Sequence, residues 1–322
     1  MMTHEMRQLW MIGLVVFSVF AEPGRGGSQT TAAAGQGAAA YRLNVSVDEV
    51  VLTFHAADAH GLSVDDLKLD EVNLQDNGRP PRKILAFQFL QNFPIRAGIL
   101  MDTSESMMQT RSRDRAIAMR FAQQVLRRQT DRAFVIDFER FPKLAQPWTN
   151  EAGSLAEGIR NYTGYGGSHL HTTAIFDAIY QACLNQFGHI DNTASGNFIL
   201  LFTDGEDNAS HASLKLVVDM CQRANTAIYP FRAGNPSGFS EGPKVLTELA
   251  TETGGRVFHD DESDAAVYED LRIIEADLRN QYRLIYKPPD MKHDGSFHRI
   301  ALQAPERVDS ITVRSGYYAP MR

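Results

Sequence analysis

The sequence has little cysteine, no excess of basic residues and no long apolar run of transmembrane length. Its 322 residues include only 2 cysteines, which excludes a disulfide-dense mini-domain and a multi-cysteine zinc ribbon. Lys and Arg total 32 against 39 Asp and Glu, a net charge of -7. The broad basic footprint of a nucleic-acid-binding protein is therefore missing, although a local basic patch is not excluded. The ordinary share of Gly (24) and Pro (13) excludes a collagen-like or wholly disordered chain.

The remaining composition, 43% hydrophobic and 22% charged, is that of a soluble protein with about two domains. At the N-terminus, Arg7 precedes the apolar run Leu9–Phe20, and small residues stand at the −3 and −1 positions before Glu22. This pattern predicts a signal peptide over residues 1–21, cut near Ala21, and a secreted, periplasmic or envelope location with no transmembrane segment in the mature form. An uncleaved anchor or a buried helix is the alternative. Residues 22–40, rich in Gly, Ala, Ser and Thr, are typical of a flexible spacer.

The segment that follows the spacer has the pattern of β-strands. Tyr41–Val47 alternates apolar and polar residues, and Val50–Phe54 is a second strand candidate. Asp76-Asn77-Gly78 is a strong turn signal between Val72–Leu74 and Ile84–Phe89, so we expect a hairpin or a short loop there.

The C-terminal segment adds three strand candidates, Tyr282–Tyr286, Arg299–Gln303 and Ser310–Val313. Neither flank has enough strands for independent stability. We therefore expect residues 41–92 and 281–319 to pack as one small all-β, β-sandwich-like domain built from both ends of the chain.

Between the flanks, over residues 93–280, short apolar runs alternate with segments of helical period. This alternation predicts an α/β domain with a doubly wound, mainly parallel, Rossmann-like sheet. The expected strands are Ile95–Met101, Ala133–Phe138, Phe198–Phe202, Ala227–Phe231 and Arg256–Phe258, and the expected helices are Asp114–Arg128, Thr173–Phe187, Ser213–Ala224, Lys244–Thr253 and Asp264–Asn280.

Three oxygen-rich loops follow strands of this sheet. One begins Asp102-Thr103-Ser104-Glu105-Ser106, another holds Thr203-Asp204-Gly205, and a third leads to Thr173 at a helix start. Ligands of open α/β sheets bind beyond the carboxyl ends of the strands, so we expect these loops to meet at one edge. Carboxylate and hydroxyl oxygens with little charge suit Mg²⁺, with Mn²⁺ or Ca²⁺ as alternatives. The alternative for Ser104 and Ser106 is that they only cap a helix beginning near Ser106.

Taken together, Asp102-x-Ser104-x-Ser106, Thr173 and Asp204 resemble the metal-ion-dependent adhesion site of von Willebrand factor type A domains. The resemblance implies a binding module in which Ser104, Ser106 and Thr173 are direct ligands, Asp102 and Asp204 act mainly through water, and an acidic residue of a protein partner completes the shell. His171 and Thr172 replace the glycines usual before this threonine.

The flanks have a family resemblance of their own. Asp76-Asn77-Gly78 before the α/β domain, and Gln281–Tyr286 with Arg314–Tyr317 after it, are similar to a secreted bacterial subgroup of von Willebrand factor A-related proteins. In regulated members of the family, the helix that corresponds to Asp264–Asn280 shifts on binding, so the resemblance raises the same question here.

Other polar residues near the predicted site are candidates for contact with a partner. Tyr165, His169 and His171 lie in the loop before Thr173, as does Tyr162, and Glu206 and Asp207 follow Asp204. Each also has a simpler interpretation, as a loop residue or as a solvated charge that caps a helix. The sequence alone does not decide between partner contact and these simpler roles.

The two cysteines, Cys183 and Cys221, fall on helices that flank the Phe198–Phe202 strand. Right-handed crossovers place both helices on one face of the sheet, where the cysteines form a disulfide in an oxidising compartment or stay as buried thiols.

The function expected from these features is that of a secreted, Mg²⁺-dependent protein-binding or adhesion module and not of an enzyme. One alternative is a metal-dependent hydrolase, in which Asp102 is the nucleophile. Such enzymes usually have a second Asp two residues later, where this chain has Ser104. The other alternative is a non-catalytic cell-envelope assembly component with an unused metal site. The partner and the oligomeric state do not follow from the sequence.

Overall fold

The computed structural model describes residues 48–160, 172–188, 196–233, 240–259 and 263–321, which share one compact unit. Its centre is a sheet of six strands in the order β6-β5-β4-β7-β8-β9. All neighbouring pairs are parallel except β5 and β6, which are antiparallel at one edge. The strands are β4 (Ile95–Asp102), β5 (Arg132–Phe138), β6 (Lys143–Thr149), β7 (Gly196–Thr203), β8 (Thr226–Arg232) and β9 (Phe258–His259).

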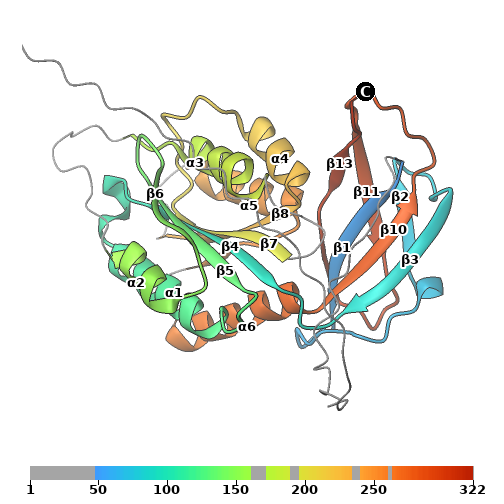
Figure 1. The fold of residues 1–322 in the computed structure, drawn as a ribbon, viewed down its shortest axis with the longest axis horizontal. Helices are drawn as coiled ribbons and strands as arrows, with labels where there is room; N and C mark the ends of the chain where they lie inside the picture. Colours follow the sequence, from blue (N-terminus) through green and yellow to red (C-terminus); the bar gives the residue numbers. More distant parts are fainter. Residues whose placement is uncertain (1–47, 161–171, 189–195, 234–239, 260–262, 322) are drawn as a thin grey trace, which may run out of the picture. The chain divides into compact units, whose positions relative to one another are not determined.

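Helices cover both faces of this sheet (Figure 1). One hydrophobic core lies under α1, α2 and α6, and a second lies under α3, α4 and α5. All eight residues of β7 are buried because helices cover both faces of the strand, and its sequence is accordingly a nearly continuous apolar run. The helices are α1 (Arg111–Gln124), α2 (Ala152–Arg160), α3 (Ile175–Gln181), which continues as a π-helical turn (Ala182–Phe187), α4 (Leu214–Arg223), α5 (Gly242–Thr253) and α6 (Asp264–Arg279).

The chain on either side of the α/β domain forms a second, all-β domain. A four-stranded sheet has the order β12-β1-β10-β3, and a three-stranded sheet has the order β13-β11-β2. Each sheet pairs N-terminal strands with C-terminal strands, so the predicted fold class is confirmed, with its small β domain built from both flanks. The strands are β1 (Val50–Ala57), β2 (Asn73–Asp76), β3 (Lys83–Leu90), β10 (Gln281–Lys287), β11 (Phe297–Gln303), β12 (Ser310–Val313) and β13 (Gly316–Tyr318), and a 3-10 turn (Leu69–Glu71) precedes β2.

Several details differ from the expectations. β6, α2 and β13 are additional elements. The turn expected at Asp76-Asn77-Gly78 is present, closed by two backbone hydrogen bonds between Asp76 and Arg79. The strands on either side do not pair with each other, since β2 pairs with β11 while β3 pairs with β10. The helix expected to begin near Ser106 is a short 3-10 helix (Glu105–Met108), and the α-helix α1 begins only at Arg111. The strand expected over Tyr41–Val47 lies outside the described residues.

The two cysteines form a disulfide. Cys183, in the π-helical turn, joins Cys221 of α4 across a sequence separation of 38 residues. Both lie in the core on one face of the sheet, as the right-handed crossovers predict. The bond ties together the helices on either side of β7.

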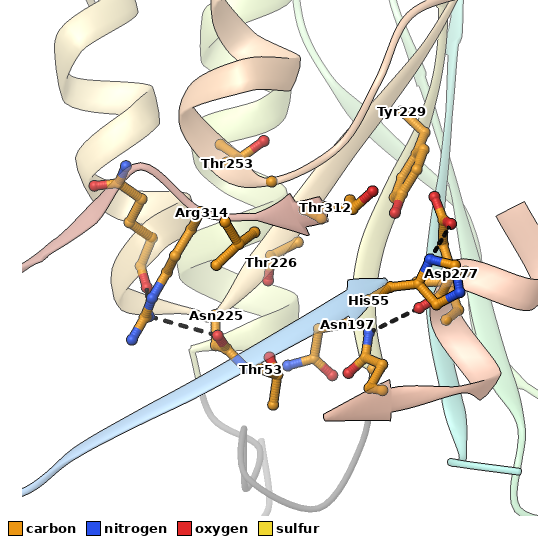
Figure 2. Close-up of a pocket in the computed structure, with 17 residues that line it drawn as sticks. Thr53, His55, Asn197, Asn225, Thr226, Tyr229, Thr253, Asp277, Thr312 and Arg314 are labelled. Atoms are coloured by element: carbon orange, nitrogen blue, oxygen red, sulfur yellow. Dashed lines mark hydrogen bonds and ion pairs between the residues drawn. The ribbon is translucent and has the colours of Figure 1, made fainter. Parts of the chain in front are cut away.

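Two short linkers connect the domains, and they lie side by side. Phe93 N donates to Arg279 O at 2.9 Å, and Arg279 Nη1 donates to Phe93 O at 3.2 Å. A second contact joins β1 to α6, where His55 Nδ1 lies 2.7 Å from Asp277 Oδ1 (Figure 2). The cavity at this contact has a volume of about 40 Å³. This is room for water-sized molecules only, so the contact serves as a packed junction.

No helix in the described part of the chain combines the length and the apolar character needed to cross a membrane.

Candidate functional site

Asp102 is the last residue of β4, and it is buried where the strand ends. Its Oδ1 accepts a hydrogen bond from Ser104 N at 2.9 Å. Its Oδ2 accepts one from Thr203 Oγ1 at 2.6 Å, across from the end of the neighbouring strand β7. Because β4 and β7 are parallel and adjacent, their carboxyl ends hold these two side chains together. The loop after β4 and the loop after β7 therefore meet at this edge of the sheet, as the sequence predicts.

The two serines of the first loop lie next to each other, with Ser104 Oγ and Ser106 Oγ 3.1 Å apart. Ser104 stands at the N-cap of the 3-10 turn, but within the described residues its side chain makes no capping hydrogen bond to that turn. Helix capping alone thus does not account for Ser104. The pair presents two adjacent hydroxyl oxygens beside the Asp102 carboxylate.

Asp204 follows β7, and its negative charge acts on Asp102. Asp204 Oδ1 accepts a hydrogen bond from Glu206 N at 3.0 Å. The loop turns at Gly205, whose φ is 90° and where a Cβ atom would lie 2.6 Å from Gly242 O. Only glycine fits this close approach and this left-handed backbone, so the start of α5 fixes the path of the loop.

Thr173 lies just before α3 and is buried. Its N–H donates to Asn208 Oδ1 at 2.7 Å, and its carbonyl oxygen accepts from Asn208 N at 3.0 Å. The next residue, Ala174, donates to Glu139 O in the turn after β5 at 2.7 Å. The Thr173 loop is thus held between the loops that follow β7 and β5, at the same edge of the sheet as Asp102.

The pKa of Asp102 is raised to about 6. Burial is the main cause and the neighbouring Asp204 charge adds to it, while the hydrogen bonds from Ser104 and Thr203 act in the opposite direction. A carboxylate whose pKa is raised in this way is stabilised in its charged form by a nearby cation. The donor set of carboxylate and hydroxyl oxygens therefore fits a hard divalent cation such as Mg²⁺. Among the described residues, no group of three or more His, Cys, Asp and Glu side chains is placed to hold a metal ion, so the candidate set depends on the serine and threonine hydroxyls as well as on the carboxylates.

The candidate contact residues fall into two groups. Asp207 Oδ1 accepts from Ile175 N at 2.9 Å and from Ser210 Oγ at 2.7 Å, so Asp207 caps α3, the helix that precedes it in the chain. Glu206 Oε1 accepts from Gly242 N at 3.4 Å and from Ser240 Oγ. The other candidates, Tyr162, Tyr165, His169 and His171, lie outside the described residues.

Three features of this edge were not predicted from the sequence: the roles of Thr203 and Asn208, and an exposed pair of apolar side chains. Thr203 donates a hydrogen bond to Asp102, and Asn208 binds the backbone of Thr173. Both contacts depend on which loops meet in the fold, so no local sequence pattern indicates them. Met108 and Phe141 are large apolar side chains with exposed fractions of 62% and 66%. The turn that contains Phe141 is hydrogen-bonded to the site on both sides, since Phe138 O accepts from Thr103 N and Glu139 O accepts from Ala174 N.

Residues 98–206 match the protein family described as von Willebrand factor type A domain. This segment begins in β4 and ends in the loop after β7, so it includes Asp102, both serines, Thr173 and Asp204. The match covers about a third of the chain and agrees with the resemblance that the motif predicted. No curated protein matches the chain.

Solved structures with some similarity include the conserved hypothetical protein BatB from Bacteroides thetaiotaomicron, at 18% identity over 56% of this chain and 97% of that chain, with a TM-score of 0.45. The mussel byssus proximal thread matrix protein 1, in a structure described as having a zinc-occupied MIDAS motif, has 16% identity over 58% of this chain and 48% of that chain, with a TM-score of 0.47. A von Willebrand factor type A protein from Catenulispora acidiphila has 14% identity over 79% of this chain and 75% of that chain, with a TM-score of 0.44.

Proposed function

We propose that this protein is an exported, non-catalytic binding module that holds a divalent cation, Mg²⁺ by preference, and uses it to bind an acidic side chain of a protein partner. The observation that carries the proposal is the buried Asp102, with its raised pKa, beside two adjacent serine hydroxyls at the edge of the sheet. In this proposal Ser104, Ser106 and Thr173 hold the cation directly, and Asp102 and Asp204 hold it through water. The weakly neutralised cation supplies an electrophilic position that a partner's carboxylate fills.

The surroundings of the site support a protein as the partner. Met108 follows the two serines after one intervening residue, and Phe141 lies in the turn bound to Thr103 and Ala174. Isolated apolar side chains are ordinary on a protein surface, but two large ones at the rim of a polar site favour contact with apolar groups of a macromolecule. We therefore expect the partner's acidic residue to have apolar neighbours.

A binding role also agrees with the hydrogen bonds of Asp102. A nucleophilic carboxylate needs an oxygen aimed at its substrate, whereas both Asp102 oxygens accept hydrogen bonds from Ser104 N and Thr203 Oγ1. The position two residues after Asp102, where a hydrolase of this kind places a second carboxylate, is Ser104. These two observations favour the binding module over the hydrolase.

Calorimetric titration with Mg²⁺ and Mn²⁺ tests the proposal. We expect the intact protein to bind either ion, and Asp102→Ala and Thr173→Ala to abolish the binding while the circular dichroism spectrum stays nearly unchanged. Asp264→Ala is the matched control, because Asp264 is a carboxylate 86% exposed at the start of α6. If the intact protein binds neither ion at millimolar concentration, the proposal fails.

Two further measurements address the partner and the export. A pull-down from cell-envelope extract is expected to capture a partner in Mg²⁺ and to lose it in EDTA, and Phe141→Ser is expected to weaken capture without loss of metal binding. N-terminal sequencing of the exported protein is expected to begin at Glu22.

A further inference from the structure

An open cavity of about 510 Å³ lies at the C-terminal ends of α1 and α6, beside the linkers between the two domains. Four arginines line it, Arg127, Arg128, Arg272 and Arg279, together with Asn92 and one carboxylate, Glu275. We propose that this cavity binds a small molecule carrying two or more oxyanion groups, of the phosphate or carboxylate kind. The proposal concerns a surface made of other residues than the metal site and does not depend on the proposed function.

The floor of the cavity is rigid and already neutral. Arg279 is buried and forms two parallel hydrogen bonds with Asp131, from Nη1 to Oδ1 at 2.9 Å and from Nη2 to Oδ2 at 2.7 Å. Its remaining hydrogen bonds go to Phe93 O and to Val125 O. Burial raises the pKa of Asp131, but the hydrogen bonds from Arg279, Ile95 N and Arg128 N outweigh it and hold this pKa below its usual value. Because these hydrogen bonds already occupy its guanidinium group, Arg279 forms the fixed floor of the cavity and is not the ligand's main contact.

The rim provides the adaptable positive charge. Arg127 is 62% exposed and Arg272 is 45% exposed, and each pairs with a glutamate on α6. Exposed ion pairs of this kind contribute little free energy, so an incoming anion can replace them at small cost. Arg128 donates to the neutral oxygens of Asn92, its carbonyl and its side-chain Oδ1. Three guanidinium groups can thus turn toward one ligand.

The carboxylate of Glu275 is bound by two of the arginines that line the cavity. One Arg127 nitrogen, Nη2, lies 2.8 Å from Glu275 Oε1 and 2.9 Å from Oε2, and Arg279 Nε lies 3.7 Å from Oε1. The carboxylate of Glu275 therefore already occupies one oxyanion position. A ligand with two or more oxyanion groups would compete with Glu275 at this position and reach Arg128 and Arg272 with the others.

The chemistry of the guanidinium group selects the ligand class. Its planar fork forms paired hydrogen bonds with phosphate or carboxylate oxygens. A volume of several hundred Å³ suits a small organic molecule better than a single inorganic ion. In a chain with a net charge of -7, these four arginines outnumber the three carboxylates paired with them, Asp131, Glu269 and Glu275, so the local charge is positive.

Titration calorimetry with pyrophosphate and with citrate, in metal-free buffer at low salt, tests the inference. We expect the intact protein to bind at least one of the two, with pyrophosphate alone indicating a phosphate compound and citrate alone a polycarboxylate. Arg127→Gln combined with Arg272→Gln should weaken binding about tenfold or more. Glu275→Gln should tighten it about threefold or more, because the competing carboxylate is removed.

The control variants separate a site from general attraction of anions. Arg223→Gln on α4 is the matched control, since Arg223 is 38% exposed and is also paired with a carboxylate, Asp219, but does not line the cavity. It should leave the affinity unchanged, as should Asp102→Ala at the metal site. No binding of either probe at millimolar concentration, or an equal loss in Arg223→Gln, would overturn the inference. An unchanged or weaker affinity in Glu275→Gln would contradict the role given to Glu275.

Discussion

Each domain contains a buried aspartate that accepts several hydrogen bonds, Asp76 in the β domain and Asp102 in the α/β domain. The groups that surround the two carboxylates differ. In the β domain, Asp76 accepts from Tyr286 OH at 2.9 Å, from Tyr317 OH at 2.8 Å and lies 2.7 Å from His298 Nδ1. In the α/β domain, Asp102 is bonded to Ser104 and Thr203, at the ends of strands. The donors of Asp76 are rings fixed on β10, β11 and β13, whereas those of Asp102 come from a loop and a strand end.

The difference separates a structural carboxylate from the one that we propose binds a cation. Burial raises the pKa of Tyr286 and of Tyr317, and their hydrogen bonds to Asp76 raise both further, so both hydroxyls keep their protons and continue to donate. Asp76 itself is fully buried beside these rings. Short hydroxyl side chains around Asp102 satisfy the carboxylate and still present oxygens to a cation. The predictions below test this contrast.

The largest effect is expected from removal of the structural carboxylate. Asp76→Ala leaves two tyrosine hydroxyls and a histidine buried without their acceptor, so the free energy of unfolding should fall by about 3–5 kcal/mol. Urea denaturation at pH 7 measures this change. A loss below about 1 kcal/mol would show that Asp76 is not a structural centre of the β domain.

A third buried aspartate, Asp137 of β5, has neither kind of surroundings. Burial raises its pKa to about 7, against the charges of Arg115 and Lys143. The folded protein therefore keeps this proton up to about pH 7, while the unfolded chain loses it near pH 4. The free energy of unfolding should fall as the pH rises from about 4 to 7 by about 2–4 kcal/mol from this group, and stay level above.

Asp137→Asn isolates that contribution, because the amide does not titrate. The difference in stability between the variant and the parent, measured by denaturation at pH 4.5 and at pH 8, should shift in favour of the variant at the higher pH. Equal differences at the two pH values would exclude Asp137 as the source.

A smaller effect is expected from loss of a single donor to Asp76. Tyr286→Phe removes one hydroxyl and keeps the ring, so it should cost about 1–3 kcal/mol of stability. Tyr268→Phe is the control: Tyr268 is 43% exposed on α6, and its change should fall within about 0.5 kcal/mol. Thermal denaturation of both variants measures the contrast, which disappears if the Asp76 cluster is dispensable.

The smallest change in stability is expected at the binding carboxylate. Without metal, Asp102→Asn should alter the free energy of unfolding by about 1 kcal/mol or less, because it removes a charge that burial already disfavours. Divalent-ion binding should nevertheless be lost. A destabilisation as large as that of Asp76→Ala would place Asp102 in the same structural class and break the comparison.

The fold was predictable from the sequence where an element is buried on both faces, because such an element is apolar along its length. Strands β4, β5, β7 and β8 are continuous apolar runs, since both faces are covered. The edge strand β6 carries no such run: it includes Pro147, and all of its residues are exposed or half-buried. α2 is only nine residues long and contains two glycines, and β13 has only three residues, so both are shorter than the window over which a periodic pattern identifies an element.

The site was predictable to the extent that its residues follow strands. Asp102, Ser104 and Asp204 could be placed together because parallel strands end at one edge of the sheet. The partners that hold them, Thr203 for Asp102 and Asn208 for Thr173, depend on how loops distant in sequence meet, and this is set by tertiary packing. Whether Asp102, Ser104, Ser106, Thr173 and Asp204 bind a metal stays a prediction.

The place of β4 in the chain has a mechanical consequence. This strand runs from Asp102, at the edge where we propose the metal site, back to Ile95, and a linker of a few residues then connects it to β3 of the other domain. Tension applied by a partner at Asp102 would pull β4 along its own axis. Its hydrogen bonds with β5 and β7 would then be loaded in shear, all together, and not opened one after another. The covalent chain itself would carry the remaining force straight into the β domain.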